Sequence, residues 1–208
     1  MINQKVLEFF ECMRVFLKLG SQQINPNGDL LRKLTHDEIS SKRLSVAEMA
    51  TADRLPIYGM LDNIRSLYNV GSMFRTSDGA LVKKLYLTGY TPKPPRKEIE
   101  KTALGSTKSV EWEYQSDPMQ AIDAMKALGV KVCALEHTTS SKCYFDITAT
   151  DFPICLVVGN EIAGVSPQVI NAADMAIEIP MHGIKQSLNA AVAYGIALFE
   201  LVRIWKTQ

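Results

Sequence analysis

From residue 57 onward, short apolar runs alternate with amphipathic stretches, and this alternation restricts the possible fold more than any other feature of the sequence. The runs have the length and composition of buried strands; they cover residues 57–61, 85–88, 110–114, 130–135, 154–158 and 176–179. Helical spacing of apolar residues occurs at 69–81, 117–129, from 166 onward and at 187–205. This order predicts an α/β fold, in which helices cover both faces of a mostly parallel sheet.

The first quarter of the chain follows a different pattern. An apolar helical stripe covers residues 1–20, a turn-rich linker covers 25–29, and capping-box sequences begin at Thr35 and Ser45. These short polar helices offer too little apolar surface to fold alone. We therefore expect a helical N-terminal extension over residues 1–55 and a main domain over residues 56–208.

Composition excludes several classes of protein. No run approaches the ~18 to 20 apolar residues of a membrane helix. The four cysteines, Cys12, Cys133, Cys143 and Cys155, are widely spaced without a C-x-x-C pair, which indicates buried thiols in a reducing cytoplasm. Only three histidines are present and they are scattered, so no metal site is expected.

Charge is unevenly distributed, although the net charge is only +1. Seven cations face two acids between Lys83 and Lys108, a surplus of 7 − 2 = +5, whereas the segment from Ser109 to the end has 6 − 11 = −5. Such a segment is either a solvated charged loop or one face for a polyanion. The candidate contacts to such a polyanion, which would be RNA if the family resemblance described below holds, are Lys93, Arg96, Lys97, Lys101 and Lys108.

Three loops could carry chemistry, because ligands of parallel sheets collect at the carboxyl ends of strands. The first loop, 61–76, contains Asn69 and Arg75, which are either a helix cap with a surface arginine or a guanidinium suited to phosphate. The second, 156–166, has Gly159-Asn160-Glu161 and matches neither the dinucleotide nor the P-loop fingerprint.

The third loop runs from Ile179 through Ser187-Leu188-Asn189 into an Ala-rich helix. Ser and Asn are good helix N-caps, and free backbone N–H groups at a helix start form a polar binding site. The many Ala and Gly residues of this helix predict the close approach of another piece of backbone.

Together these loops resemble the motifs of the SpoU/TrmH family of RNA ribose 2′-O-methyltransferases. The first motif stands as Asn69 with Arg75-Thr76, and the second as Gly159-Asn160-Glu161 with Gly164-Val165-Ser166. The third stands as Ile179-Pro180-Met181 with Ser187-Leu188-Asn189. The three motifs occur in the family's order and cover roughly residues 57 to 205.

The resemblance implies features that the residue pattern alone does not reveal. It implies a C-terminal trefoil knot that forms the S-adenosylmethionine site, and a homodimer that completes the active site. Either the knot or the dimer interface would explain the Ala/Gly helix. By resemblance, the catalytic residues are Arg75, Asn69, Glu161, Ser187 and Asn189. The cofactor-binding residues are Gly159, Asn160, Ile179, Met181, Ser187, Leu188, Asn189, Thr88 and Gly89.

The implied activity is transfer of a methyl group to a ribose 2′-hydroxyl of RNA, with transfer RNA favoured over ribosomal RNA. For Arg75, clamping a phosphate is easier to defend than acting as a base, because a guanidinium with a pKa above ~12 accepts protons poorly. The alternative is a catalytically silent RNA-binding protein on the same fold. A nicotinamide-dependent oxidoreductase is disfavoured, because the glycine fingerprint is missing.

Overall fold

The computed structural model describes residues 32–41 and 43–207, so the predicted helix over 1–20, the linker and Cys12 lie outside its range. The chain divides into two compact units, residues 1–45 and 46–208. The first unit contains α2 (His36–Ser40), whose capping box is confirmed: Thr35 Oγ1 accepts the Glu38 N–H, and Glu38 Oε2 accepts the Thr35 N–H over 2.8 Å. The predicted helix after Ser45 is α3 (Val46–Thr51) in the second unit. The division into an extension and a domain at residue 55 stays a prediction.

A seven-stranded sheet forms the centre of the second unit, and every pair of neighbouring strands is parallel. Its strand order is β3-β2-β1-β6-β4-β7-β5. The strands are β1 (Leu55–Asp62), β2 (Val82–Thr88), β3 (Trp112–Gln115), β4 (Lys131–Leu135), β5 (Lys142–Cys143), β6 (Ile154–Val158) and β7 (Met175–Glu178). The parallel sheet predicted from the sequence is confirmed.

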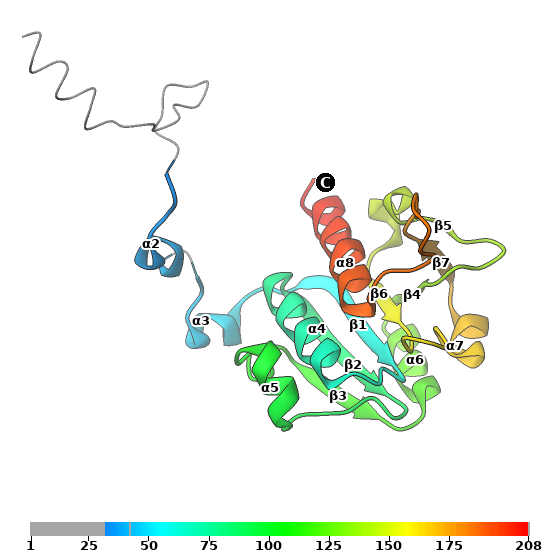
Figure 1. Ribbon diagram of the computed structural model, residues 1–208, viewed down its shortest axis with the longest axis horizontal. Coiled ribbons are helices and arrows are strands. Elements are labelled where there is room, and N and C mark those ends of the chain that lie inside the picture. Colours follow the sequence, from blue (N-terminus) through cyan, green and yellow to red (C-terminus); the bar gives the residue numbers. More distant parts are fainter. Residues whose placement is uncertain (1–31, 42, 208) are drawn as a thin grey trace, which may run out of the picture. The chain divides into compact units, whose positions relative to one another are not determined.

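Helices cover both faces of this sheet (Figure 1). The helices α4 (Leu67–Gly79), α5 (Lys97–Ala103) and α8 (Ala190–Lys206) lie on one face, and α6 (Pro118–Ala127) and α7 (Pro167–Ala172) lie on the other. Because strand side chains alternate between faces, Ile57 and Leu61 pack with α4 and α8, whereas Met60 packs with α6 and α7. Two hydrophobic cores therefore hold the sheet between its helical layers.

The register brings the functional loops to one edge. Leu61 of β1 pairs with Leu87 of β2 and with Val158 of β6, and Leu135 of β4 pairs with Ile177 of β7. Parallel strands that end at the same level release their following loops at the same edge. The loops after β1, β2, β4, β6 and β7 thus meet on one side of the molecule.

The structure corrects four expectations. The region 90–105, expected as a loop, contains α5, whose only buried side chains are Ile99 and Ala103, too few for a helical stripe in the sequence. The last helix begins at Ala190 and not at Ser187, and its N-cap is Asn189. Cys143 is only half-buried, unlike Cys133 and Cys155. The fourth correction is to the expectation that another piece of backbone closely approaches the Ala-rich helix α8.

At Gly195 no other piece of backbone comes close: the nearest atom to an added Cβ is Thr76 Cγ2, at 3.7 Å, which is an ordinary van der Waals contact. The tight backbone approach lies instead at Gly71 of α4, where a Cβ would collide with the Ile99 carbonyl of α5. A second close contact lies at Gly59 of β1, which leaves room for the buried ring of Tyr194. Small residues here let α5 and α8 settle closely against α4 and the sheet.

Candidate active site

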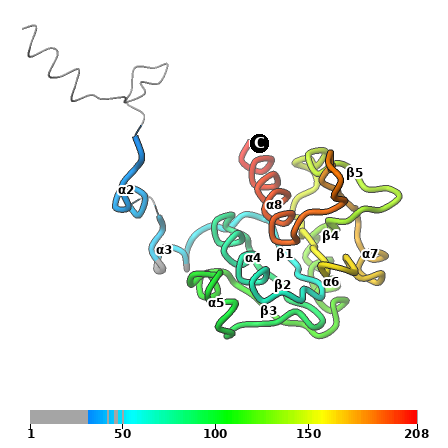
Figure 2. The backbone as a smooth tube through the Cα atoms, viewed as in Figure 1, coloured from blue at the N-terminus to red at the C-terminus, as the bar shows by residue number. Residues whose placement is uncertain are grey.

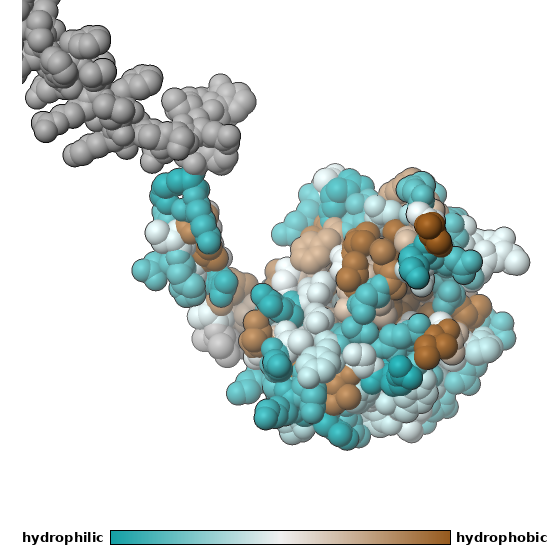
Figure 3. All heavy atoms as spheres, in the orientation of Figure 1, coloured by the Kyte–Doolittle hydropathy of each residue, from teal (hydrophilic) through white to brown (hydrophobic). Residues whose placement is uncertain are grey.

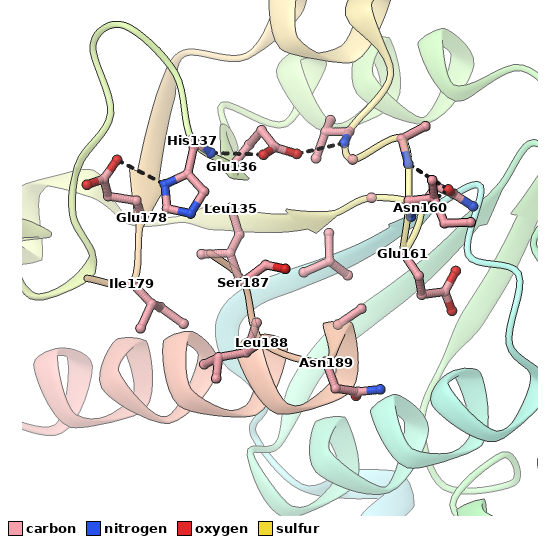
Figure 4. Close-up of a pocket in the computed structure, with 18 of the residues that line it drawn as sticks. Leu135, Glu136, His137, Asn160, Glu161, Glu178, Ile179, Ser187, Leu188 and Asn189 are labelled. Atoms are coloured by element: carbon pink, nitrogen blue, oxygen red, sulfur yellow. Dashed lines mark hydrogen bonds and ion pairs between the residues drawn. The ribbon is translucent and has the colours of Figure 1, made fainter. Parts of the chain in front are cut away.

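A cavity of about 460 Å³ opens at the carboxyl edge of the sheet (Figure 4). Its walls come from the ends of β4, β6 and β7, from the turn after β6 and from the segment that leads into α8. Eight of the predicted site residues line it: Gly159, Asn160, Glu161, Ile179, Met181, Ser187, Leu188 and Asn189. The second and third predicted loops therefore converge on one site, although they lie apart in the sequence.

The turn after β6 is a rigid part of the wall. Asn160 and Gly164 exchange two backbone hydrogen bonds of 2.9 Å each, and Asn160 Oδ1 accepts the N–H groups of Ile162 and Ala163. Gly159 has no space for a side chain, because a Cβ there would collide with the backbone of Gly164 and Val165. The turn therefore folds back onto the end of its own strand and exposes its backbone to the cavity.

Glu136 fixes this turn to the end of β4. Its carboxylate accepts the His137 N–H at 2.9 Å and the Val165 N–H at 3.0 Å, the contacts drawn at the top of Figure 4. Glu136 was not among the site residues predicted from the sequence. Its position directly after a predicted buried strand was the available signal, because that position falls at the ligand-binding edge of a parallel sheet.

His137 and Glu178, also missed, connect the loops after β4 and β7. His137 Nδ1 lies 3.4 Å from Glu178 Oε2, and Nε2 lies 3.1 Å from the Gln186 carbonyl oxygen. Ser141 donates its hydroxyl hydrogen to the same Glu178 oxygen over 2.5 Å. The Ser141 hydroxyl, followed by His137, holds the pKa of Glu178 below its usual value.

Glu161 joins the turn after β6 to the start of α4. Its carboxylate accepts the backbone N–H groups of Arg65 and Ser66 at 2.9 and 3.0 Å and the side-chain amide of Asn69 at 2.8 Å. Partial burial raises the pKa of Glu161, but these hydrogen bonds outweigh burial and leave the pKa below its ordinary value. A carboxylate at this position also complements the positive end of the α4 dipole.

Asn189 completes the link between the three loops. Its Oδ1 caps α8 by accepting the N–H groups of Ala191 and Val192 at 2.9 and 3.4 Å. Its Nδ2 donates to Asn69 Oδ1 over 3.2 Å. A helix cap was one of two interpretations of Asn69 from the sequence; the α4 cap is Ser66, which leaves the Asn69 amide to bridge Glu161 and Asn189.

Four of the predicted catalytic and cofactor-binding residues lie outside the cavity lining: Asn69, Arg75, Thr88 and Gly89. Asn69 reaches the site only through Glu161 and Asn189. Thr88 is fully buried and donates to the Leu61 carbonyl, so this cavity gives no support to its predicted cofactor contact. Gly89 is closed off by the side chain of Asn63.

The predicted RNA contacts and Arg75 are exposed. Lys93, Arg96, Lys97, Lys101 and Lys108 all carry exposed side chains in or beside α5. The Lys93 ammonium lies 3.8 Å from the centre of the Tyr114 ring. Within the described ranges, Arg75 makes no hydrogen bond or ion pair, so its guanidinium is available to a ligand or a partner.

The described residues also bear on the expected absence of a metal site and of a membrane span. Over residues 32–41 and 43–207, no group of three or more His, Cys, Asp or Glu side chains could hold a metal ion. None of the described helices is long and apolar enough to cross a membrane.

Fold and cavity together define a class: a parallel α/β domain with a cavity at the carboxyl edge of its sheet, beside which polar residues of three loops meet. The chain belongs to the SpoU rRNA Methylase family, which matches residues 56–199. The family resemblance of the three motifs is thereby confirmed.

Known relatives agree with this assignment. A tRNA (guanosine(18)-2′-O)-methyltransferase of Aquifex aeolicus is 38% identical over 143 residues, covering 68% of this chain and 66% of the relative. The solved Aquifex aeolicus TrmH/SpoU tRNA modifying enzyme has a TM-score of 0.70 and 33% identity, covering 77% of this chain and 81% of that one. An AdoMet-bound rRNA methyltransferase from Sinorhizobium meliloti has a TM-score of 0.68 and 27% identity, covering 93% and 77%. The chain spans 57–66% of the length of the first three curated relatives it matches.

Proposed function

We propose that this protein transfers a methyl group from S-adenosylmethionine to a ribose 2′-hydroxyl of RNA. The observation that carries the proposal is the convergence of Glu161, Asn69 and Asn189 beside a cavity of about 460 Å³. That volume falls within the range of about 300–1,000 Å³ typical of small-molecule sites. The relatives named above support the reaction class, because their names specify methyl transfer to RNA.

The residues of the cavity fit this cofactor. Three carboxylates line the cavity, those of Glu136, Glu161 and Glu178, and its lining contains no lysine or arginine. Such a wall favours a positively charged ligand over an anionic one such as a dinucleotide. When bound there, S-adenosylmethionine supplies a methyl group on a positively charged sulfur. Exposed backbone at Gly159, Ile179 and Leu188, with the side chains of Asn160, Met181 and Ser187, would hold its adenosine and methionine parts.

The chain's own contribution to the reaction is placement of the acceptor hydroxyl. Asn69, Glu161 and Asn189 form a fixed polar group at the cavity rim, and Ser187 lies on its wall. Fixing the hydroxyl in line with the transferred methyl lowers the entropic part of the barrier. We assign Arg75 to a phosphate of the substrate, since its bidentate geometry suits phosphate and its pKa does not suit a base.

A homodimer would bring Arg75 to a cavity, which explains why it does not line the cavity of its own chain. One face of α8 and the residue before its cap expose a stripe of large apolar side chains: Leu188, Val192, Ile196 and Phe199, each 37–51% exposed. Figure 3 shows hydrophobic residues gathered over α8 and the segment before it. At the end of α4, Gly79 lies beside the ring of Phe199. We propose that a second copy covers this face and that Arg75 acts at its cavity.

Mixing two inactive variants tests this arrangement. Arg75→Ala and Asn189→Ala damage different parts of the site, so a mixed dimer regains one intact site only when Arg75 acts across the interface. Random assortment of the two subunits then restores about a quarter of wild-type activity. An inactive mixture, in which mass spectrometry detects the mixed dimer, places Arg75 at the site of its own chain.

We also propose that the C-terminal part forms the trefoil knot. The connection from β4 to β6 supports it, since this connection carries β5 outside β7 and returns through the 3-10 helices η1 (Tyr144–Asp146) and η2 (Ala149–Asp151). Phe152, at its end, packs against Trp205 of α8 with ring centres 5.4 Å apart. In the proposed knot, the chain from β7 to α8, traced in Figure 2, would thread through this connection before α8 begins.

The RNA substrate would contact the basic segment from Lys93 to Lys108, because phosphate neutralisation supplies affinity that is independent of sequence. Charge reversal at Lys93, Arg96 and Lys97 should weaken RNA binding and flatten its salt dependence. Transfer RNA remains our preferred substrate, and ribosomal RNA is the alternative. A cytoplasmic location and the absence of a resident metal remain part of this proposal.

Two measurements test the proposed function. Calorimetry should detect binding of S-adenosylmethionine and no binding of NAD. Tritiated methyl transfer to total RNA from a strain that lacks this gene should then label a ribose 2′-oxygen, and mapping identifies the RNA. Cofactor binding without transfer to any RNA would favour the catalytically silent RNA-binding protein, and failure to bind the cofactor would refute the proposed activity.

A further inference from the structure

Tyr90 combines an exposed ring with an unusually well-fixed backbone and hydroxyl. Its side chain is 61% exposed, yet its hydroxyl oxygen accepts a hydrogen bond from Asn160 Nδ2 over 2.8 Å. Its backbone N–H donates to Asn63 Oδ1 over 3.2 Å. The residue is therefore held at its backbone and at its hydroxyl, while most of its surface remains exposed.

The residues on either side of Tyr90 explain why it is fixed. Gly89 adopts a left-handed conformation with a φ of 63°, and its carbonyl oxygen accepts the Tyr114 hydroxyl over 2.8 Å. Thr91 is buried, donates to the Leu61 carbonyl over 2.9 Å and accepts the Ile64 N–H over 3.0 Å. These contacts anchor the loop after β2 to the end of β1.

Tyr90 lies between the cofactor cavity and the basic segment. Asn160, its hydrogen-bond partner, lines the cavity, so the phenol oxygen lies one hydrogen bond from the cavity wall. Three residues further along, Lys93 begins the basic segment and places its ammonium over the ring of Tyr114. An exposed aromatic ring beside cations is the combination with which proteins bind unpaired nucleotides.

We propose that Tyr90 is a stacking platform for an unpaired base of the RNA substrate, at or next to the nucleotide that is methylated. This inference rests on the proposed function and narrows its substrate to RNA that is unpaired at the target. Bases in loops and bulges stack on aromatic side chains, whereas bases within a duplex already stack on each other. A ring that is fixed before binding loses little conformational entropy when a base stacks on it.

Two substitutions separate the ring from its hydroxyl. Tyr90→Phe keeps the aromatic face and removes the hydrogen bond to Asn160, whereas Tyr90→Leu removes both. We expect Tyr90→Phe to bind RNA nearly as well as wild type. We expect Tyr90→Leu to weaken RNA binding by about 5- to 150-fold, the effect of losing one base–aromatic stack. Binding of S-adenosylmethionine should be equal in the two variants, because both lack the hydrogen bond.

Phe145→Leu is the matched control, since Phe145 of η1 is 58% exposed and belongs to neither the cavity lining nor the basic segment. It should leave RNA binding unchanged. Equal losses in Tyr90→Phe and Tyr90→Leu would show that the hydroxyl matters and not the ring. Wild-type affinity in Tyr90→Leu would overturn the platform outright.

A fluorescence measurement tests stacking directly. In Tyr90→Trp, a single-stranded oligoribonucleotide should quench the emission that remains after subtraction of the wild-type signal from Trp112 and Trp205, and a duplex of the same sequence should quench it less. Equal quenching by the duplex would overturn the preference for unpaired bases. If the wild-type protein methylates RNA and Tyr90→Leu binds RNA with wild-type affinity, only the stacking platform is refuted. If the wild-type protein binds neither S-adenosylmethionine nor RNA, the proposed function is refuted as well.

Discussion

Asn69 donates its side-chain amide to Glu161 across 2.8 Å and thereby joins two loops that lie 92 residues apart in the sequence. The other end of the same amide accepts from Asn189, which is 120 residues from Asn69. One side chain thus connects the start of α4, the turn after β6 and the start of α8. Since a change at any of the three alters the hydrogen bonds of the other two, they should behave as one unit.

Glu161 should make the protein more sensitive to acid. Its folded pKa lies below the ordinary value of 4.5, so its stabilising effect is complete above that value and is lost as the pH falls through the folded pKa. In Glu161→Gln, the free energy of unfolding should therefore fall less than in wild type between about pH 5 and pH 3. Urea denaturation at several pH values measures both curves.

The control for this prediction is Glu98→Gln. Glu98 is an exposed carboxylate of α5, and it forms no hydrogen bond or ion pair within the described residues. In Glu98→Gln, the free energy of unfolding should fall between about pH 5 and pH 3 as much as it does in wild type. Parallel curves for wild type and Glu161→Gln would contradict the assigned role of the three donors to Glu161.

Two substitutions at Asn189 should separate stability from activity. Asn189→Ala removes the cap of α8 and should cost about 0.5–2 kcal/mol in the free energy of unfolding. Asn189→Asp keeps an oxygen acceptor for Ala191 and Val192 and suits the positive helix end, so its stability should stay close to that of wild type.

Asn189→Asp should nevertheless impair methyl transfer. It cannot donate to Asn69 Oδ1, and Asn69 cannot turn its amide around without withdrawing the donor from Glu161. Denaturation and methyl-transfer assays on the same preparations measure the two effects. Wild-type activity in Asn189→Asp would mean that the link between the asparagines is dispensable.

Most strands and helices could be predicted because each carries its own pattern. The run 154–158 is apolar throughout since β6 is buried on both faces, and the helix after Pro118 begins where proline favours a first turn. In contrast, α5 and β5 depend on their neighbours. Two buried side chains and the space above Gly71 hold α5, and pairing with β7 alone defines β5.

Some site residues could likewise be predicted from local sequence, and others could not. Gly159, Glu161 and Asn189 could be found from their motifs, because they belong to short segments of fixed spacing. The roles of Glu136 and Tyr90 arise from Val165 and Asn160, which are 29 and 70 residues away, and no local pattern encodes those contacts. Only the folded chain shows which polar side chains meet.

Tyr194 and Ser77 form a buried pair that a double-mutant cycle can measure. The tyrosine ring is fully buried, and its hydroxyl lies 2.8 Å from Ser77 Oγ. Tyr194→Phe should cost about 1–3 kcal/mol in stability, since it leaves a buried hydroxyl without its partner. The double variant Tyr194→Phe with Ser77→Ala should be less destabilised than the sum of the single variants. Strict additivity would show that the two hydroxyls do not interact.

Gly159 should tolerate no side chain, because the cavity wall depends on its close contact with the turn after β6. In Gly159→Ala, the new methyl group would collide with the backbone of Gly164 and Val165 and displace the turn. Overpacking of this kind costs about 1–3 kcal/mol. The displaced turn also carries Asn160 and Glu161, so the loss in the free energy of S-adenosylmethionine binding should exceed the loss in the free energy of unfolding.

Gly183→Ala is the matched control, since nothing lies within 4 Å of its added Cβ. Calorimetry on both variants decides the matter: unchanged cofactor affinity in Gly159→Ala would mean that the turn does not form the wall of the binding site.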